Sequence, residues 1–460
     1  MIGPENRTKI QFMQVAITTG EASGDRVAGE LAVEIRRLRP DAQIWGAGGR
    51  AMKAAGVDVI IDTSRFGAIG VGGVIPLLPK ILSARRTLFD AMKVRRPDVV
   101  VAVDAGAFHY GFGPIQGLCP WLRQHLPDTQ IMAWMPPSSW RRTLKGSSLG
   151  QCTDAVSSPF LWNAAELKRY GVNAQFLGHP LIDFVKSTMT DEQASSKYGL
   201  DMNRPIVALM PGSREQEIAE ILPVMLDAAY QMSARIQGLQ FMLGLASTMD
   251  RSRLEQAVLD AHERAIARQS GSDVRLRDPS MDFTMAPVHV TAGGGQSLPN
   301  KPTWGVEPRP RRDVNTLALV IAENETFDLL HIADVAICVS GTVTLEAAIL
   351  GTPMVIVYRL PRRGLWQYKM MKRRLPPFIG LPNLIAGKCV CPELLQDAVN
   401  ADELADATVL LLLDPQRIFT MKEALRLVRQ SLGEPGAVNR TAQWICDLTD
   451  GTSHKGYDVP

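Results

Sequence analysis

The chain has few cysteines, few aromatic residues and almost no excess charge of either sign. Its 460 residues include six cysteines, 6% aromatic residues, and 50 Lys and Arg against 47 Asp and Glu. No two cysteines have the Cys-x-x-Cys spacing of a zinc ribbon or a redox motif, so we expect reduced thiols, no metal and no cofactor. The formal net charge of +3 is too small for a protein whose main partner is a nucleic acid.

Long hydrophobic runs are also missing. The longest apolar stretch, residues 66–82, is interrupted by four glycines, two prolines and a lysine, and it is shorter than the roughly 20 residues that span a bilayer. The first nine residues contain a glutamate and no long apolar run, unlike a secretory signal. These features predict a cytoplasmic protein without a transmembrane helix. At about 100 to 200 residues per domain, the length predicts two to three domains.

Short β-branched runs alternate with longer helical patterns along the chain, which is typical of parallel strands joined by crossover helices. The predicted strands are 14–18, 43–46, 98–104, 130–134, 155–157, 174–177, 206–210, 241–245, 317–322, 335–339 and 354–358. The clearest helical patterns are 25–39, 215–237 and 249–268. The predicted fold is α/β, with two Rossmann-like, doubly wound parallel-sheet domains facing a cleft.

A polar stretch from Lys186 that lacks a strand pattern separates the two domains. The first is expected at 10–185 and the second at 186–430, followed by a C-terminal helix and tail at 431–460. A stretch rich in proline and glycine, at about 279–312, cannot form a regular element. We interpret it as a surface insertion, with a lid over the cleft as the alternative.

The first predicted strand is followed by Gly20-Glu-Ala-Ser-Gly-Asp25 and then by a helix. Glycines allow a sharp turn and a close approach to a ligand, while the amides at a helix start attract anions. Ala22 interrupts a Gly-x-Gly-x-x-Gly pattern, and no Gly-Lys-Ser/Thr follows, so a dinucleotide fingerprint and a Walker A loop are both excluded. By itself, the segment fits a substrate loop and a simple strand–helix turn equally well.

Another predicted strand ends at Asp104. A carboxylate at the end of a buried strand lies at the rim of the expected cleft, where desolvation raises its pKa toward the range of a general base. An aspartate that caps the next turn is the equally open alternative.

Two further segments in the second half follow a strand and open a helix. In the first, Arg214 has the donor geometry to clamp a diphosphate, although an ion pair with Glu217 explains the same residues. In the second, Ser340-Gly-Thr342 offers amides and hydroxyls to a phosphate, and Glu346 suits a ribose diol. A helix cap followed by an acidic first turn is the structural alternative.

Several segments together resemble the lipid-A-disaccharide synthase family of glycosyltransferases. They occur in the family's order and cover nearly the whole chain outside the insertion. The matching stretches are 20–25, 48–52, 55–56, 97–104, 178–183, 209–217, 340–346, 353–354, 381–384 and 392–396.

The resemblance implies an inverting, metal-independent transferase of the GT-B type. Such an enzyme moves an acylated glucosamine from UDP-2,3-diacylglucosamine to a diacylglucosamine 1-phosphate, which forms the lipid A disaccharide. Its implied partners are a UDP-sugar donor, a lipid acceptor and the inner-membrane surface, and a homodimer is left open. The implied donor-binding residues are Ser213, Arg214, Ser340, Gly341, Thr342, Glu346 and Asn383. The implied catalytic residues are Asp104, His109 and Glu21, and the acceptor-side residues are Gly20, Ser23, Asp25 and His179.

The departures from the family pattern are concentrated in the first half. The usual Asp-Ala-Pro-Asp-Phe-Asn is here Asp104-Ala-Gly-Ala-Phe-His109. This leaves two alternatives open, a transferase with a different acceptor and a non-catalytic UDP-sugar-binding relative. We expect Asp104 to be the base and His109 to hydrogen-bond the acceptor. The reverse assignment stays possible because the unperturbed pKa of histidine is nearer the working pH.

Membrane contact is predicted at two segments. The first is 66–82, followed by Arg85 and Arg86, and the second is 359–374, which mixes basic and aromatic residues. Basic residues attract anionic lipids, and apolar residues insert among them. A core segment and a solvated helix face are the respective alternatives.

Overall fold

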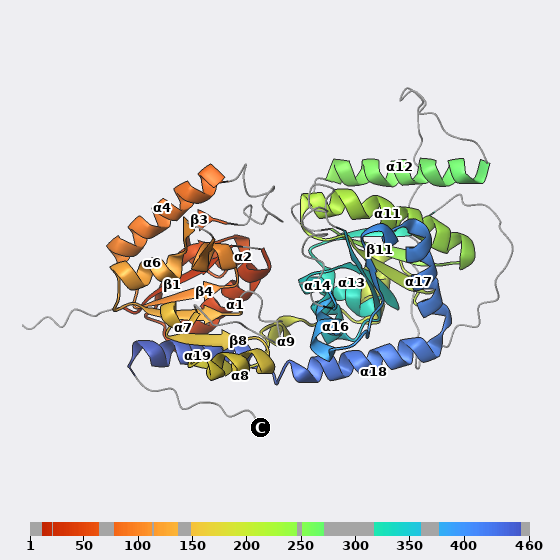
Figure 1. Ribbon diagram of the computed structural model, residues 1–460. Helices are drawn as coiled ribbons and strands as arrows, with labels where there is room; N and C mark the ends of the chain where they lie inside the picture. Colours follow the sequence, from red (N-terminus) through yellow and green to blue (C-terminus); the bar gives the residue numbers. More distant parts are fainter. Residues whose placement is uncertain are drawn as a thin grey trace, which may run out of the picture. The chain divides into compact units, whose positions relative to one another are not determined.

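The structure is a computed structural model that describes residues 12–20, 22–63, 78–112, 115–136, 149–245, 251–270, 317–359 and 377–451. It contains two compact units, one of Met1–Phe184 with Gln430–Pro460 and one of Val185–Arg429 (Figure 1). Along the chain, the first unit gives way to the second after Phe184, one residue before the boundary expected after residue 185. The predicted insertion at 279–312, Glu21 and most of both predicted membrane segments lie outside the described residues.

The first unit is built on a seven-stranded sheet in the order β3-β2-β1-β4-β7-β8-β9, in which all neighbouring strands are parallel. These strands are β1 (Gln14–Thr19), β2 (Gln43–Gly48), β3 (Asp58–Asp62), β4 (Val99–Val103), β7 (Gln130–Trp134), β8 (Ala155–Ser158) and β9 (Ala174–Phe176). A short antiparallel pair, β5 (Gly111–Phe112) and β6 (Ile115–Gln116), lies apart from the sheet. Every residue of β4 is buried, as expected for a central strand covered on both faces.

Helices cover both faces of this sheet. They are α1 (Ala22–Leu38), α2 (Arg50–Ala54), α4 (Leu78–Arg95), α5 (Gly106–Tyr110), α6 (Leu118–His125), α7 (Leu149–Cys152), α8 (Leu161–Arg169), α9 (Leu181–Phe184) and α19 (Ala437–Thr449). Side chains alternate between the faces of a strand, so Val99 and Val101 join α1 and α19 in one core cluster. Val100 and Ala102 join α4 and α6 in the other. The central strands therefore contribute to two cores.

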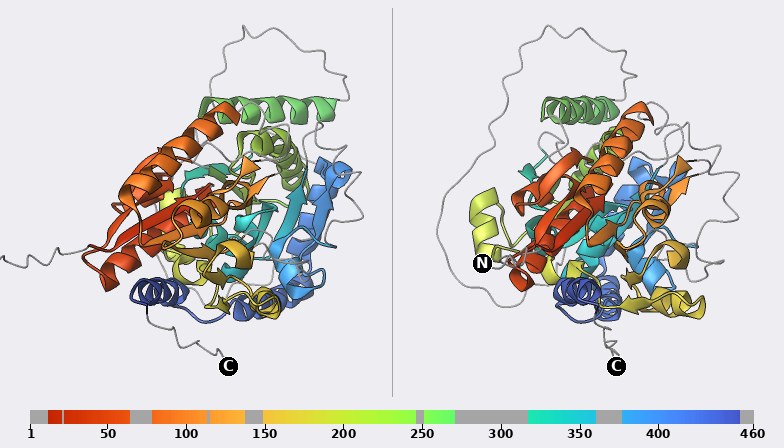
Figure 2. Two further views of the ribbon diagram at one scale, coloured as in Figure 1. Left: turned by 60° about the vertical axis from the view of Figure 1, so that its left-hand side comes forward. Right: turned by 90° about the vertical axis from the view of Figure 1, so that its left-hand side faces the viewer.

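The C-terminal helix α19 packs on the first unit, where the sequence led us to expect a separate helix and tail. Trp444 and Ile445 are buried in the same cluster as α1, and both views of Figure 2 show α19 beside the first unit's strands. The Asp183 carboxylate accepts hydrogen bonds from the Gly436 and Val438 amides at its start. An amphipathic pattern predicts such a helix but not which sheet its apolar face covers.

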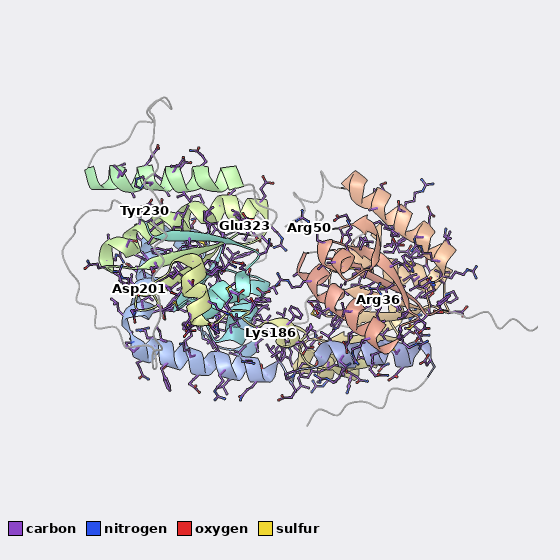
Figure 3. The ribbon with its side chains drawn as sticks, turned by 180° about the vertical axis from the view of Figure 1, so that it is seen from behind. Arg36, Arg50, Lys186, Asp201, Tyr230 and Glu323 are labelled. Atoms are coloured by element: carbon purple, nitrogen blue, oxygen red, sulfur yellow. The ribbon has the colours of Figure 1, made fainter. Side chains whose placement is uncertain are left out.

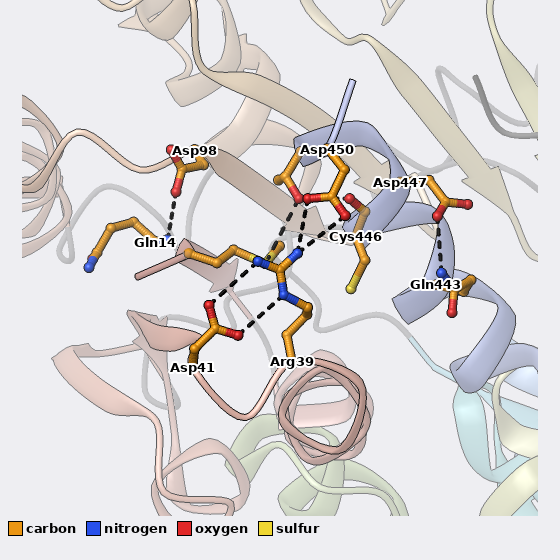
Figure 4. Close-up of polar contacts among 10 residues, drawn as sticks. Gln14, Arg39, Asp41, Asp98, Gln443, Cys446, Asp447 and Asp450 are labelled. Carbon is orange, nitrogen blue, oxygen red and sulfur yellow. Dashed lines mark hydrogen bonds and ion pairs between the residues drawn. The ribbon is translucent and has the colours of Figure 1, made fainter. Parts of the chain in front are cut away.

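Polar contacts close the far end of α19 (Figure 4). Arg39, just after α1, forms ion pairs with Asp41 at 3.2 Å and with Asp450 at 3.0 Å. Nearby, the Asp98 carboxylate accepts a hydrogen bond of 2.7 Å from the Gln14 amide. The ion pair between Arg39 and Asp450 therefore joins the end of α1 to the end of α19 within the first unit.

The second unit has a six-stranded parallel sheet in the order β12-β11-β10-β13-β14-β15. Its strands are β10 (Ile206–Met210), β11 (Gln240–Leu245), β12 (Leu319–Glu323), β13 (Val335–Val339), β14 (Met354–Tyr358) and β15 (Glu393–Leu395). Its helices are α10 (Asp191–Tyr198), α11 (Glu215–Arg235), α12 (Arg251–Ser270), α13 (Thr326–Ile332), α14 (Thr342–Leu350), α16 (Leu381–Ala386), the 3-10 turn η4 (Gln396–Ala398), α17 (Ala401–Leu413) and α18 (Pro415–Ser431). Tyr230 of α11, labelled in Figure 3, hydrogen-bonds His262 of α12 at 3.0 Å.

The predicted fold class, two doubly wound parallel sheets, is confirmed. All eleven predicted strands are present, with ends that differ by at most two residues. The edge strands β3 and β15 were missed, because both are short and only partly buried. Among the described residues, no helix is long and apolar enough to cross a bilayer.

Candidate functional site

In the first unit, two predicted site loops meet at the carboxyl edge of the sheet. Thr19, the last residue of β1, is paired with Val103, the last residue of β4. Gly20 therefore emerges beside Asp104, and a Cβ built on Gly20 would lie only 2.7 Å from the Ala105 Cβ. The sequence-predicted Gly20 and Asp104 loops are thus in contact, and a larger residue at position 20 would push them apart.

The turn after β4 has an unusual backbone. Asp104 and Ala105 are consecutive non-glycine residues with positive φ, at 51° and 46°. Such conformations cost on the order of 1 to 3 kcal/mol each and persist only where the surroundings hold them. The Asp104 amide donates to the Trp134 carbonyl at 3.1 Å, which extends the sheet's hydrogen bonding by one residue. Helix α5 begins at Gly106, directly after this turn.

His109, in α5, is completely buried beneath the turn. Its Nδ1 lies 2.8 Å from the Asp104 carbonyl oxygen, and its Nε2 lies 2.9 Å from the Thr18 Oγ1. Burial lowers the pKa of His109 to about 4, although hydrogen bonding to the backbones of Asp104 and Thr18 opposes the shift. The sequence suggested an imidazole that titrates near the working pH and meets the acceptor. The structure instead encloses the ring completely, and this burial favours its neutral form.

The Asp25 carboxylate accepts hydrogen bonds from three backbone amides of the first unit. Its Oδ1 accepts from the Gly49 amide at 2.6 Å and from the Met52 amide at 3.2 Å, and its Oδ2 accepts from the Ala51 amide at 2.8 Å. This carboxylate therefore satisfies the start of α2, which begins at Arg50 (Figure 3). The contacts explain the matching stretch 48–52, and they differ from the acceptor-side role that we expected for Asp25. Ser23 lies in the first turn of α1.

His179, another residue expected on the acceptor side, is buried near the C-terminal segment. Its amide donates to the Leu432 carbonyl at 2.8 Å, and its Nδ1 accepts from the Leu181 amide at 3.2 Å. The Phe160 ring lies 5.8 Å from its centre, and burial lowers its pKa to about 3. These contacts indicate that His179 packs the C-terminal segment onto the first unit.

In the second unit, the loops after β10 and β13 also meet at one edge. The two strands are neighbours, with Met210 paired with Cys338. Gly212 has a φ of 106°, and a Cβ there would lie 2.9 Å from a Glu217 carboxylate oxygen and 3.7 Å from Val339. Glycine therefore lets the first loop pass between α11 and the end of β13. Ser213 and Arg214 follow directly and reach the start of α11.

Arg214 forms the ion pair that the sequence left as an alternative. Its Nη1 lies 2.9 Å from the Glu217 Oε1, and its side chain is 34% exposed whereas that of Glu217 is 7% exposed. A guanidinium has five N–H donors in a planar fork, so one ion pair does not use its full hydrogen-bonding capacity. Glu217 thus orients Arg214.

The start of α14 is open to solvent. Gly341, at the N-cap, is exposed and Thr342 is half-buried, and no side chain caps the helix there. Amides at a helix start carry partial positive charge and bind anions. Glu346, one turn further on, is buried. The Ser340 hydroxyl donates to the Ile379 carbonyl at 3.0 Å, which joins this helix start to the loop before α16.

Asn383 supports that loop. Its side chain is fully buried. Its Nδ2 donates to the Cys391 carbonyl and to the Glu393 carboxylate, both at 2.8 Å. Its Oδ1 accepts from the amides of Val390 and Cys391. These four bonds use the full capacity of the side-chain amide. Asn383 therefore shapes the loop, whereas the sequence led us to expect a contact between its side chain and the UDP-sugar donor.

Glu393 completes this support and was not among the predicted site residues. Its carboxylate accepts from the Ile379 and Gly380 amides, at 3.0 and 2.9 Å. The only sequence signal for it was its place in the matching stretch 392–396.

Among the described residues, no group of three or more His, Cys, Asp or Glu side chains is arranged to hold a metal ion.

Comparison with solved structures agrees with this fold. The UDP-GlcNAc 2-epimerase from Neisseria meningitidis bound to UDP-GlcNAc superposes with a TM-score of 0.55 at 10% identity, covering 95% of this chain and 99% of that one. S. aureus MnaA, in a co-structure with UDP, gives a TM-score of 0.57 at 13% identity, covering 98% and 100%. At this identity, the likeness concerns the fold alone.

Sequence comparison is more specific. The chain is 30% identical over 437 residues to the lipid-A-disaccharide synthase of Geobacter metallireducens, covering 95% of this chain and 97% of that protein. It is 30% identical over 440 residues to the lipid-A-disaccharide synthase of Solibacter usitatus, covering 95% and 98%. The family model described as lipid-A-disaccharide synthetase matches residues 15–270 and 305–445. These stretches include both loop clusters, and the chain belongs to the lipid-A-disaccharide synthetase family.

Proposed function

We propose that this chain is a hexosyltransferase that moves 2,3-diacylglucosamine from UDP to a 2,3-diacylglucosamine 1-phosphate, which forms the lipid A disaccharide and releases UDP. The observation that carries the proposal is the family match over both units. The loops described above are where such chemistry belongs, because ligands of doubly wound sheets bind beyond the carboxyl ends of the strands.

The second unit supplies the donor side. Arg214 and the amides of Gly341 and Thr342 face the diphosphate, and Ser213, Ser340 and Glu346 complete the binding set. Breaking the bond between the anomeric carbon and the diphosphate oxygen leaves negative charge on UDP. A guanidinium and helix-start amides stabilise that charge, most strongly where water is excluded.

The first unit supplies the base. The acceptor hydroxyl oxygen bonds to the anomeric carbon, its proton passes to the Asp104 carboxylate, and UDP departs with the electron pair of the broken bond. A base must lie within hydrogen-bond reach of the hydroxyl. Asp104 supports this role because its turn is held at a strand end in a costly conformation, which is typical of functional sites.

Product analysis tests the activity. The purified chain is incubated with UDP-2,3-diacylglucosamine and diacylglucosamine 1-phosphate, and products are identified by mass spectrometry. Formation of a disaccharide monophosphate with stoichiometric UDP is expected. If UDP is released only when another acceptor is offered, the chain is a transferase with a different acceptor. If UDP binds but no acceptor of a broad panel supports turnover, the chain is a binding protein.

The donor site is tested by Arg214→Ala. Loss of one charge-assisted diphosphate contact should cost about 1.5 to 3 kcal/mol, or roughly tenfold to a hundredfold in UDP affinity by calorimetric titration. Arg235→Ala is the matched control, since Arg235 lies at the other end of α11 and is also paired with a carboxylate, that of Asp406. An affinity equal to that of the control removes Arg214 from the site.

We also propose that the protein is cytoplasmic and associates peripherally with the inner membrane, since both substrates carry acyl chains. Residues 66–82 and 359–374 are the proposed contacts. Co-sedimentation with anionic vesicles should decrease at high salt, because basic residues each contribute about 1 kcal/mol of attraction to anionic lipid. Lack of binding at low and at high salt would refute the association. A homodimer, which the resemblance leaves open, is tested by sedimentation velocity.

A further inference from the structure

We infer that His109 is a positioning residue that links Thr18 to the Asp104 backbone and thereby fixes the direction of the Asp104 carboxylate. The inference rests on the proposed function, in which Asp104 receives the acceptor's proton. It assigns His109 a task that neither a catalytic base nor an acceptor-binding group performs.

The hydrogen bonds determine the tautomer. A carbonyl oxygen only accepts, so the Nδ1 that lies 2.8 Å from the Asp104 carbonyl must carry the proton. In a neutral ring the Nε2 is then an acceptor, and the Thr18 hydroxyl, 2.9 Å away, donates to it. Both ring nitrogens are therefore engaged within the protein.

The bridge joins two adjacent strands at their carboxyl ends. Thr18 lies near the end of β1, and Asp104 directly follows β4. In sequence, His109 is 91 residues from Thr18 and five from Asp104. The ring thus connects β1 to the turn after β4, and it helps to hold Asp104 and Ala105 in their costly left-handed backbone conformation. The centres of the Phe108 and Tyr110 rings lie 5.3 and 6.1 Å from that of the imidazole, both in edge-to-face arrangements.

Burial argues against direct contact with substrate. The His109 side chain has no exposed surface, so an acceptor hydroxyl does not reach the ring without opening the turn. Thr18 is equally buried. Asp104, Ala105 and Gly106 of the turn are half-buried and therefore partly open to solvent.

Thr18→Val is the decisive variant, because it keeps the shape of the side chain and removes the hydroxyl, which lies 2.9 Å from Nε2 and makes only a longer contact, 3.5 Å, with the Val101 carbonyl oxygen. We expect kcat to fall about tenfold to a hundredfold, the effect of small misplacements at reacting groups, with UDP affinity and donor KM unchanged. Thr18→Ser retains the hydroxyl and should restore most of the turnover. Combining Thr18→Val with His109→Leu should be no worse than His109→Leu alone, since the two residues act through one link.

Thr129→Val is the matched control. Thr129 is also buried, and its hydroxyl donates to the Pro97 carbonyl at 2.9 Å, near the start of β4 rather than its end. It should lower stability without lowering kcat. If Thr18→Val and Thr129→Val have the same turnover as the unaltered chain, the positioning role is overturned.

Two measurements do not depend on turnover, so they separate this inference from the proposed function. The 15N NMR shifts of His109 should show a proton on Nδ1 and a bare Nε2 at pH 7, and hydrogen exchange over residues 104–109 should accelerate in Thr18→Val but not in Thr129→Val. Absence of disaccharide product from the unaltered chain refutes the proposed function. A protonated Nε2, or unchanged exchange in Thr18→Val, refutes the link.

Discussion

The two units use the same kind of sheet edge in opposite ways. After β4, the chain makes a closed turn around Asp104, whose main chain is held by the fully buried His109. After β13, it makes an open turn at Gly341, where the start of α14 has no side-chain cap. Proton transfer requires one group at a defined position, whereas a diphosphate requires several donors at an accessible surface. The difference matches the two tasks assigned to the units.

The largest expected effect separates these tasks. Asp104→Asn keeps the shape of the side chain and removes its basicity, so turnover should fall by roughly a hundredfold to ten-thousandfold. UDP affinity, measured by calorimetry, should stay the same because the donor residues belong to the other unit. Asp90→Asn, at an exposed position on α4, is the control. Near-normal turnover of Asp104→Asn would end the assignment of Asp104 as base.

The next effect sharpens the contrast between ligand-binding and structural carboxylates. Asp25→Asn should destabilise the first unit by about 3 kcal/mol in chemical denaturation, because a neutral amide replaces a carboxylate bonded to three amides. The acceptor KM should change little where the variant is folded. A large rise in acceptor KM without a loss of stability would restore Asp25 to the acceptor side.

The smallest effect concerns pH. The pKa of His109 is about 4 in the folded chain against 6.5 in its ordinary state, so the unfolded chain binds the extra proton first. Stability from this group is complete above pH 6.5 and is lost as the pH falls toward 4, at about 1.4 kcal/mol per pH unit.

Between pH 7 and pH 5, His109 should therefore contribute about 2 kcal/mol to the loss of unfolding free energy. Denaturation of His109→Gln should show a correspondingly smaller loss over that range, while Thr129→Val should keep the full loss. Equal pH dependence in all three proteins would mean that the His109 ring is not held neutral. His179, with a pKa of about 3, should add a similar dependence that continues to lower pH.

Much of the fold was predictable because burial imposes a pattern on the sequence. Strands buried on both faces, such as β10 and β13, have uninterrupted apolar runs and were located without error in their ends. Edge strand β15 has three half-buried residues and leaves no such pattern. Helix α19 was expected, but its attachment to the first unit depends on Trp444 meeting a core assembled from distant segments.

The candidate site was predictable to the level of its loops. Asp104 ends a predicted strand, and Arg214 and Ser340 follow predicted strands. Parallel strands bring their carboxyl ends to one edge of each sheet. The roles of Asp25, His109 and Asn383 were not predictable, because a polar residue near a loop has the same letter whether it binds a ligand or a buried amide.

The sequence by itself determined the alternation of strands and helices, the two-sheet fold and the family, since these depend on residue order and local periodicity. Only the tertiary structure decided which polar side chains form their hydrogen bonds within the protein. Asp25 bonds to the amides of Gly49 and Met52, which are 24 and 27 residues away in the sequence. His109 bonds to Thr18, which is 91 residues away. A buried polar group must find a hydrogen-bond partner wherever the fold places one, and that placement is a property of the packed chain.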